Sequence, residues 1–67
     1  MELNKVVTIV YTNYKGNTGV RQIIPKEISF GHNEWHKEDQ WLMTAYDLQK
    51  EADRTFALKD IKAWYLN

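Results

Sequence analysis

Cysteine is absent from this chain of 67 residues, and that absence limits the folds open to it. A domain of this size buries only about 60% of the surface that its unfolded chain exposes, so many small domains rely on disulfides or structural metals. Without thiols, neither a disulfide framework nor a thiolate metal site is available. The aromatic residues, three Trp, four Tyr and two Phe, must therefore supply much of the core of a single domain over residues 1–67.

Alternation of apolar and polar residues in the first part of the chain indicates β-strands. Residues 5–14, KVVTIVYTNY, are dense in β-branched and aromatic side chains, and the alternation places Val7, Ile9 and Tyr11 on one face. The following KGNTG supplies residues that tolerate a positive φ. This pattern predicts a hairpin to a second strand, VRQIIPKEISF.

Pro25 interrupts the second strand. Proline has no N–H to donate to a β-ladder, so we expect a bend or a bulge at this residue, as a barrel corner requires. Residues 31–40 are polar except for Trp35 and are expected to form a loop, in which Trp35 either folds back onto the domain or stands ready for a partner. WLMTAY, residues 41–46, is expected to be the third strand.

The segment DLQKEAD, residues 47–53, allows two interpretations. Its residues are good helix formers, so propensity alone favours a helix. The alternative, which we prefer, is a hairpin loop followed by the strand RTFAL, a single helical turn around LKDI and a last strand, KAWYL. Five short strands separated by turns predict an all-β fold, a small closed or half-open barrel that removes exposed edges.

Trp41 is expected to lie in the core. Alternation places Trp41, Met43 and Ala45 on one face of the third strand, with Leu42, Thr44 and Tyr46 on the other. Burial of a Trp is worth on the order of 3 kcal/mol. That is a large share of the roughly 3–5 kcal/mol that so small a core supplies.

The charges of the chain sum to zero, because nine Lys and Arg balance nine Asp and Glu. Such a chain has no long-range field to attract phosphates or anionic lipids, so a nucleic-acid role would need a local patch. The N-terminal sequence MELNKVVTIVY carries an acid at position 2 and only a short apolar run. It predicts neither a signal peptide nor a membrane span, and we expect a cytoplasmic protein without membrane contact.

Catalytic and metal-binding patterns are missing from the sequence. It contains no Cys, no recognisable Ser-His-Asp triad motif and no glycine-rich phosphate loop, so we expect no enzymatic activity and no cofactor. His32 and His36, with Glu34 and Glu38, have a spacing that would suit a metal on a helix. In a loop this spacing means little, and we expect solvated surface there and no metal site.

An ordered set of residues runs along most of the chain: Ile9-x-Tyr11, Gly16 or Gly19, Arg21-x-Ile23-x-Pro25, Trp41-Leu42-Met43-x-Ala45-Tyr46-Asp47 and Arg54-x-Phe56-x-Leu58-x-x-Ile61. The set resembles the WYL domain of bacterial transcription regulators, over roughly residues 6–64. The signature tripeptide of that family matches Trp41-Leu42-Met43, with Leu in place of Tyr and Met in place of Leu. A literal WYL at Trp64-Tyr65-Leu66 follows the matched segments, and we interpret it as a coincidence.

The resemblance implies a five-stranded SH3-like or Sm-like barrel with one short helical turn. Such domains sense a ligand or contact nucleic acid, usually after a DNA-binding helix-turn-helix, for which this chain has no pattern. By the same resemblance, a binding groove would be lined by Tyr11, Arg21, Trp41, Tyr46 and Arg54.

The leading functional hypothesis is a non-enzymatic module that binds a nucleotide or single-stranded nucleic acid through Arg21 and Arg54. Guanidinium groups bind phosphate bidentately and stack on bases. The structural alternative is that each arginine pairs with a carboxylate or packs its stem on an aromatic ring. For Tyr11 and Tyr46 the alternative is a half-buried ring with a satisfied hydroxyl.

A protein-interaction module is the rival hypothesis. The chain would homo-oligomerise or dock on another protein through Trp35, Trp64, Tyr65 and an unpaired edge strand. A third interpretation is that the sequence is one domain of a longer regulator.

Overall fold

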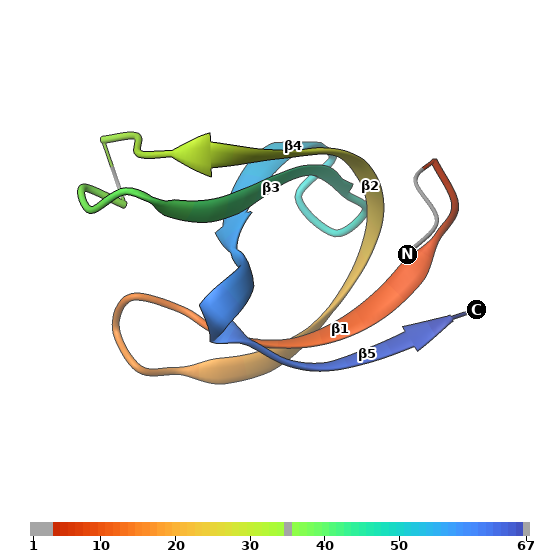
Figure 1. Cartoon of the computed structure of the whole chain (residues 1–67). Helices are drawn as coiled ribbons and strands as arrows, with labels where there is room; N and C mark the ends of the chain where they lie inside the picture. The colour runs from red at the N-terminus through yellow and green to blue at the C-terminus, as the bar shows by residue number, and fades with distance from the viewer. Residues whose placement is uncertain (1–3, 35, 67) are drawn as a thin grey trace.

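The computed structural model describes residues 4–34 and 36–66, and β-strands make up most of that part of the chain (Figure 1). All five expected strands form, together with one turn of 3₁₀ helix, so the all-β prediction is confirmed. The elements are β1 (Val7–Thr12), β2 (Thr18–Gly31), β3 (Gln40–Asp47), β4 (Ala52–Ala57), η1 (Leu58–Asp60) and β5 (Ile61–Leu66).

The strands form one antiparallel sheet in the order β4-β3-β2-β1-β5. The first four strands are joined as successive hairpins, and β5 returns to pair with β1. Figure 1 shows that the sheet is strongly curved, with β2 as its longest and most bent strand. Because the sheet curves, side chains of β4 come into contact with side chains of β1, which is not its neighbour in the sheet.

The bend expected at Pro25 is confirmed. The pairing of β2 with β3 shifts register between Pro25 and Glu27, because a proline cannot donate to the ladder. Before the shift, residues 18–23 of β2 pair with β1. The pairing with β3 runs from Ile23 to Gly31, so the two parts of β2 serve different neighbours.

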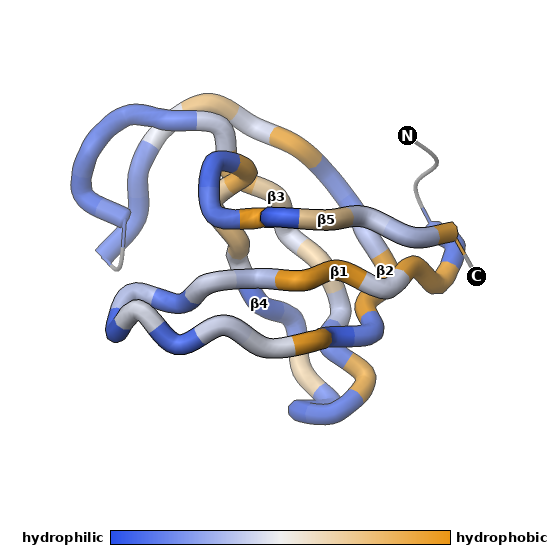
Figure 2. The backbone as a smooth tube through the Cα atoms, turned by 90° about the horizontal axis from the view of Figure 1, so that it is seen from below, coloured by the Kyte–Doolittle hydropathy of each residue, from blue (hydrophilic) through white to orange (hydrophobic). Residues whose placement is uncertain are grey.

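Two loops follow the predictions closely. The β1–β2 hairpin turns at Gly16, whose φ of +83° is costly for any residue with a Cβ. The side-chain Oδ1 of Asn13 accepts hydrogen bonds from the backbone N–H groups of Lys15 (2.9 Å) and Asn17 (3.0 Å) and fixes this turn. The loop between β2 and β3 is largely hydrophilic, as Figure 2 shows, but Trp35 lies outside the described residues.

The helix that propensity favours over residues 47–53 does not form. Asp47 ends β3, a turn covers residues 48–51, and β4 begins at Ala52. Glu51 takes a positive φ of 55° in that turn, which is incompatible with a continuing right-handed helix. The hairpin interpretation is therefore confirmed.

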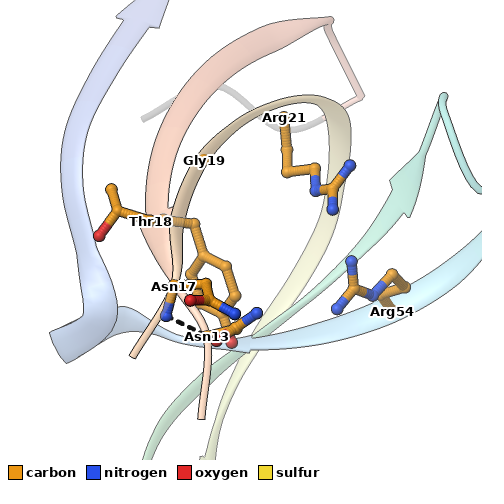
Figure 3. A pocket seen from close by; sticks show the side chains of 7 residues that line it. Asn13, Asn17, Thr18, Gly19, Arg21 and Arg54 are labelled. Carbon is orange, nitrogen blue, oxygen red and sulfur yellow. Dashed lines mark hydrogen bonds between the residues drawn. The ribbon is translucent and has the colours of Figure 1, made fainter. Parts of the chain in front are cut away.

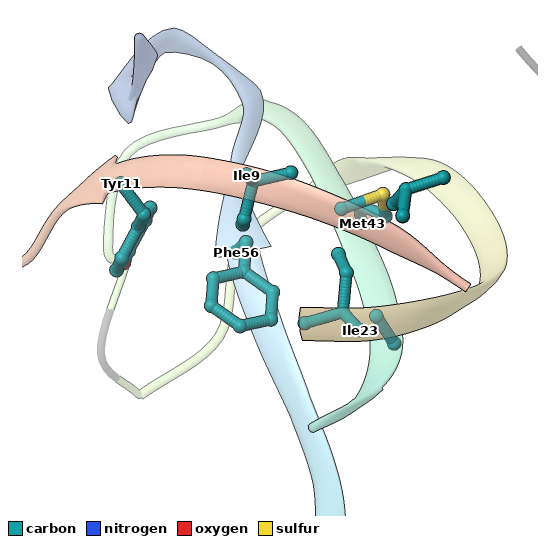
Figure 4. Close-up of a cluster of buried hydrophobic side chains, with 7 residues drawn as sticks. Ile9, Tyr11, Ile23, Met43 and Phe56 are labelled. Carbon is teal, nitrogen blue, oxygen red and sulfur yellow. The ribbon is translucent and has the colours of Figure 1, made fainter. Parts of the chain in front are cut away.

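The core lies on the concave side of the curved sheet (Figure 4). As predicted, Val7, Ile9 and Tyr11 of β1 all point inward and are buried. The rings of Tyr11 and Phe56 form a T-shaped contact at a centroid distance of 4.8 Å. The remaining buried members of this cluster come from three other strands: Ile23, Met43, Ala45 and Phe56.

The prediction of a buried Trp41 is wrong. Its side chain is 56% exposed and makes an edge-to-face contact at 5.2 Å with Phe30, which is also exposed. The pairing of β3 with β4 ends at Leu42 and Ala57, so Trp41 is paired with Phe30 of β2 on one side and has no β4 residue on the other. Without β4 beside it, this ring packs on Phe30 at the surface, and Phe56 and Tyr11 supply the aromatic core instead.

None of the helices found in the described residues is long and apolar enough to cross a membrane.

The placement of the core predicts different effects for the same substitution at two neighbouring positions of β2. Ile23 is fully buried and Ile24 is half-buried. Ile23→Val should lower the free energy of unfolding by about 1 kcal/mol, because one buried methyl group is lost. The matched variant Ile24→Val should change it by less than about 0.5 kcal/mol. Urea denaturation measures both, and an equal loss at the two positions would contradict this assignment of faces.

Candidate functional site

A hollow of about 160 Å³ lies between the β1–β2 hairpin and β4 (Figure 3). Figure 3 shows the side chains of Arg21, from β2, and Arg54, from β4, on opposite sides of this open space. The ring contact between Tyr11 and Phe56 holds β1 close to β4, although these strands are not neighbours in the sheet. The hollow is lined by Tyr11, Asn13, Asn17, Thr18, Gly19, Arg21 and Arg54.

Arg54 is held in place by two contacts. Its Nη1 donates a hydrogen bond to Oδ2 of Asp47 at 3.1 Å. Its guanidinium carbon lies 5.1 Å from the centre of the Phe56 ring, within the range of a cation–π contact. The alternative expected for an arginine, pairing with a carboxylate and packing on an aromatic ring, is therefore confirmed for Arg54. Its side chain nevertheless stays 32% exposed and lines the hollow.

Asp47 organises this region and is fully buried. Its Oδ1 accepts hydrogen bonds from the backbone N–H groups of Gln49 (2.9 Å) and Lys50 (3.2 Å), the pattern of an Asx-turn. Burial acts to raise the pKa of Asp47. The bonds from Lys50, Arg54 and Gln49, together with the charge of Arg21, outweigh burial and lower that pKa below its usual value. Asp47 is therefore a carboxylate at neutral pH.

Arg21 differs from Arg54 in having no fixed partner. Its side chain is half-buried, and residues 4–34 and 36–66 supply no ion pair or hydrogen bond to its guanidinium. A guanidinium carries five N–H donors in a planar fork. Those of Arg21 remain available to a ligand in the hollow.

Tyr11 and Asn13 add neutral donors to the two cations. Burial and the negative charge of Asp60 raise the pKa of Tyr11, against a smaller lowering by Arg54, so its hydroxyl keeps its proton. Asn13 uses its Oδ1 for the backbone of the hairpin. Its side-chain N–H₂ group is then the part of the amide left for a ligand. Cationic and neutral donors around a small hollow suit an anion.

The structure gathers only part of the predicted groove. Tyr11, Arg21 and Arg54 line the hollow, whereas Trp41 packs on Phe30 near the loop end of the β2–β3 hairpin and does not line it. Tyr46 is half-buried on β3, opposite Ile24 and Asp53 in the sheet register, and does not line the hollow.

Sequence reasoning missed Asn13, Asn17 and Asp47 as parts of this region. The signal for Asp47 was an acid at the junction of a strand and a polar turn, where its side chain can accept hydrogen bonds from backbone N–H groups. For the hairpin asparagines, the signal was only turn propensity.

The histidine pattern of residues 32–38 does not gather into a metal site in the described residues. His32 Nδ1 lies 2.8 Å from Oδ1 of Asp39 on the surface. No three His, Asp or Glu side chains within residues 4–34 and 36–66 converge as metal ligands.

Comparisons with protein families, curated proteins and solved structures return no match to this chain.

The contacts of Asp47 predict how stability depends on pH. The pKa of Asp47 is lower in the folded state than in the unfolded chain. The stabilisation by Asp47 is therefore complete at a pH above its unfolded-state pKa, and it is lost as the pH falls through its folded-state pKa. Asp47→Asn should lower the free energy of unfolding at pH 7 by about 2 kcal/mol. It should also flatten the decline in stability that we expect of the wild type as the pH falls below the pKa of this carboxyl in the unfolded chain.

Asp53→Asn is the matched control, because Asp53 pairs with Lys26 at 2.9 Å with both side chains about half exposed. Such a pair contributes less than about 1 kcal/mol. Denaturant titrations at several pH values measure both variants. A wild-type decline that persists unchanged in Asp47→Asn would show that other carboxylates cause it.

Proposed function

We propose that the protein is a non-enzymatic binding module that holds a phosphate-bearing ligand, a nucleotide or a short single strand of nucleic acid, in the hollow between Arg21 and Arg54. One observation carries the proposal: the only two arginines of a chain with zero net charge, far apart in sequence, line the same small hollow. A neutral protein gains nothing from its overall field, so phosphate recognition depends on a local gathering of this kind.

The charges around the hollow favour an anion. Arg21 and Arg54 carry two positive charges, and Asp47 behind them carries one negative charge that is already engaged by three hydrogen bonds. Within the described residues, no carboxylate lines the hollow itself. A phosphate there would meet the fork of Arg21, the exposed side of Arg54 and the hydroxyl of Tyr11.

The proposal includes the finer fold and the family context. The strand order, the bend at Pro25 and the 3₁₀ turn between β4 and β5 support a half-open barrel of the SH3-like or Sm-like kind. The ordered residues that resemble a WYL domain support a ligand-sensing role in bacterial transcription regulation, in the cytoplasm.

Arg21→Ala is the cleanest test, because it removes a charge from the hollow without breaking an ion pair within the described residues. We expect its affinity for a short single-stranded oligonucleotide to fall about tenfold or more, since hydrogen bonds to charged groups are worth about 1.5–3 kcal/mol. The slope of log affinity against log salt should also become shallower. Fluorescence titrations at three salt concentrations measure both quantities.

Lys62→Ala is the matched control, because it removes the same charge from an exposed position of β5 outside the hollow. It should leave affinity within about twofold of the wild type. Arg54→Ala should also weaken binding. Because this substitution leaves the buried Asp47 without its ion-pair partner, the folding of the variant must be verified by circular dichroism. No binding by the wild type, or equal losses in Arg21→Ala and Lys62→Ala, would refute the proposed function.

A second candidate function is assembly with a second copy of the chain. Within residues 4–34 and 36–66, β4 and β5 each pair on one side only, and Tyr65 on β5 is 56% exposed. Unpaired edges are templates for strand addition, and a net charge of zero offers no repulsion between copies.

Sedimentation equilibrium over a hundredfold range of protein concentration tests this second function. Assembly through the edge of β5 predicts a dimer that Tyr65→Ala dissociates, since this substitution removes an exposed ring from that edge. A wild type that remains monomeric over the whole range would exclude self-assembly as the main function.

A further inference from the structure

A second hollow, of about 440 Å³, adjoins the first and shares Tyr11, Asn13 and Arg54 with it. It continues toward the β2–β3 loop and β4, where its further lining residues are Tyr14, His36, Asp53 and Thr55. Small-molecule sites usually have volumes of about 300–1,000 Å³. The hollow at the arginines is below that range, whereas the second hollow lies within it.

The planar rings of Tyr14 and His36 form part of the lining of the second hollow. Tyr14 is 76% exposed, and the Nζ of Lys15 lies 5.7 Å from its ring centre. His36 is half-buried, and its backbone N–H donates to Oδ1 of Asn33 at 2.7 Å, which fixes the loop at this point. Exposed aromatic rings beside a cationic groove are platforms on which nucleobases stack.

The two hollows differ in polarity. The first presents cations and N–H donors and, among the described residues, no carboxylate. The second contains the carboxylate of Asp53, which pairs with Lys26 on the surface, and the hydroxyl of Thr55. Asp53 disfavours a second anion and can accept hydrogen bonds from amino or hydroxyl groups. Arg54 lines both hollows and marks the boundary between them.

We infer that the two hollows together bind one nucleoside monophosphate unit, with its phosphate between Arg21 and Arg54 and its base against Tyr14 and His36. The inference rests on the proposed function and adds the second half of the site. A ligand with an anionic end and a neutral planar end matches the change in polarity across Arg54. The unit can be a free nucleotide or the phosphorylated end of a strand, because both carry the same chemistry.

Calorimetric titrations with four probes separate the two hollows: inorganic phosphate, ribose 5-phosphate, adenosine 5′-monophosphate and adenosine. We expect the monophosphate to bind roughly tenfold more tightly than ribose 5-phosphate, the difference that stacking of one base produces. Tyr14→Ala should reduce this advantage to about twofold or less and leave ribose 5-phosphate binding unchanged. Phe30→Ala, which removes an exposed aromatic ring that lines neither hollow, should retain the full advantage.

Arg21→Ala should weaken both phosphate-bearing probes by a similar factor, because it acts on the part of the ligand that they share. Proton NMR supplies a second readout, in which the Tyr14 ring signals shift on addition of the monophosphate and not of ribose 5-phosphate. A 5′-phosphorylated tetra-adenylate distinguishes the two sources. A strand that binds more tightly than the monophosphate supports a strand end, and equal affinity supports a free nucleotide.

Equal wild-type affinities for adenosine 5′-monophosphate and ribose 5-phosphate would overturn this inference and leave the anion site intact. If Tyr14→Ala still bound adenosine 5′-monophosphate about tenfold more tightly than ribose 5-phosphate, the inference would likewise fail and the anion site would stand. If none of the phosphate-bearing probes binds, or if adenosine binds as tightly as its monophosphate, the proposed function fails as well.

Discussion

The hydrogen bonds to the buried carboxylate of Asp47 connect the fold of this protein to its candidate site. Two of them come from backbone N–H groups in the turn that joins β3 to β4, and the third comes from Arg54 at the edge of the hollow. A buried charge is tolerated only when donors replace the water it has lost. The turn geometry and the position of Arg54 are therefore set by the same requirement, so damage to one is expected to disturb the other.

The local distribution of charge, rather than its total, gives the chain its chemical character. Arg54 is paired with Asp47 and held against Phe56, whereas Arg21 has no fixed partner in the described residues. Arg54 is thus a fixed side of the hollow, and Arg21 provides a positive charge that no described residue engages in an ion pair. Their approach depends on the curvature of the sheet, which the register shift after Pro25 permits and the ring contact of Tyr11 with Phe56 maintains.

Features encoded by a few adjacent residues could be predicted from the sequence, and features that depend on distant segments could not. The inward face of β1, the turn at Gly16 and the bend at Pro25 follow from local alternation and backbone chemistry. The prediction that Trp41 is buried failed, because its burial depends on where β4 stops pairing with β3. Arg21 and Arg54 were selected by resemblance to a family, and no local pattern indicated that Asp47 would hold one of them and leave the other free.

The side-chain Nε–H signals of the two arginines provide the most direct test of a shared anion site. The chain has only these two arginines, so Arg21→Lys assigns both signals in a nitrogen–proton correlation spectrum. In a titration with inorganic phosphate, the signals of Arg21 and Arg54 should both shift and should follow one binding curve with a single dissociation constant. Shifts confined to one arginine, or two curves with different midpoints, would contradict a common site.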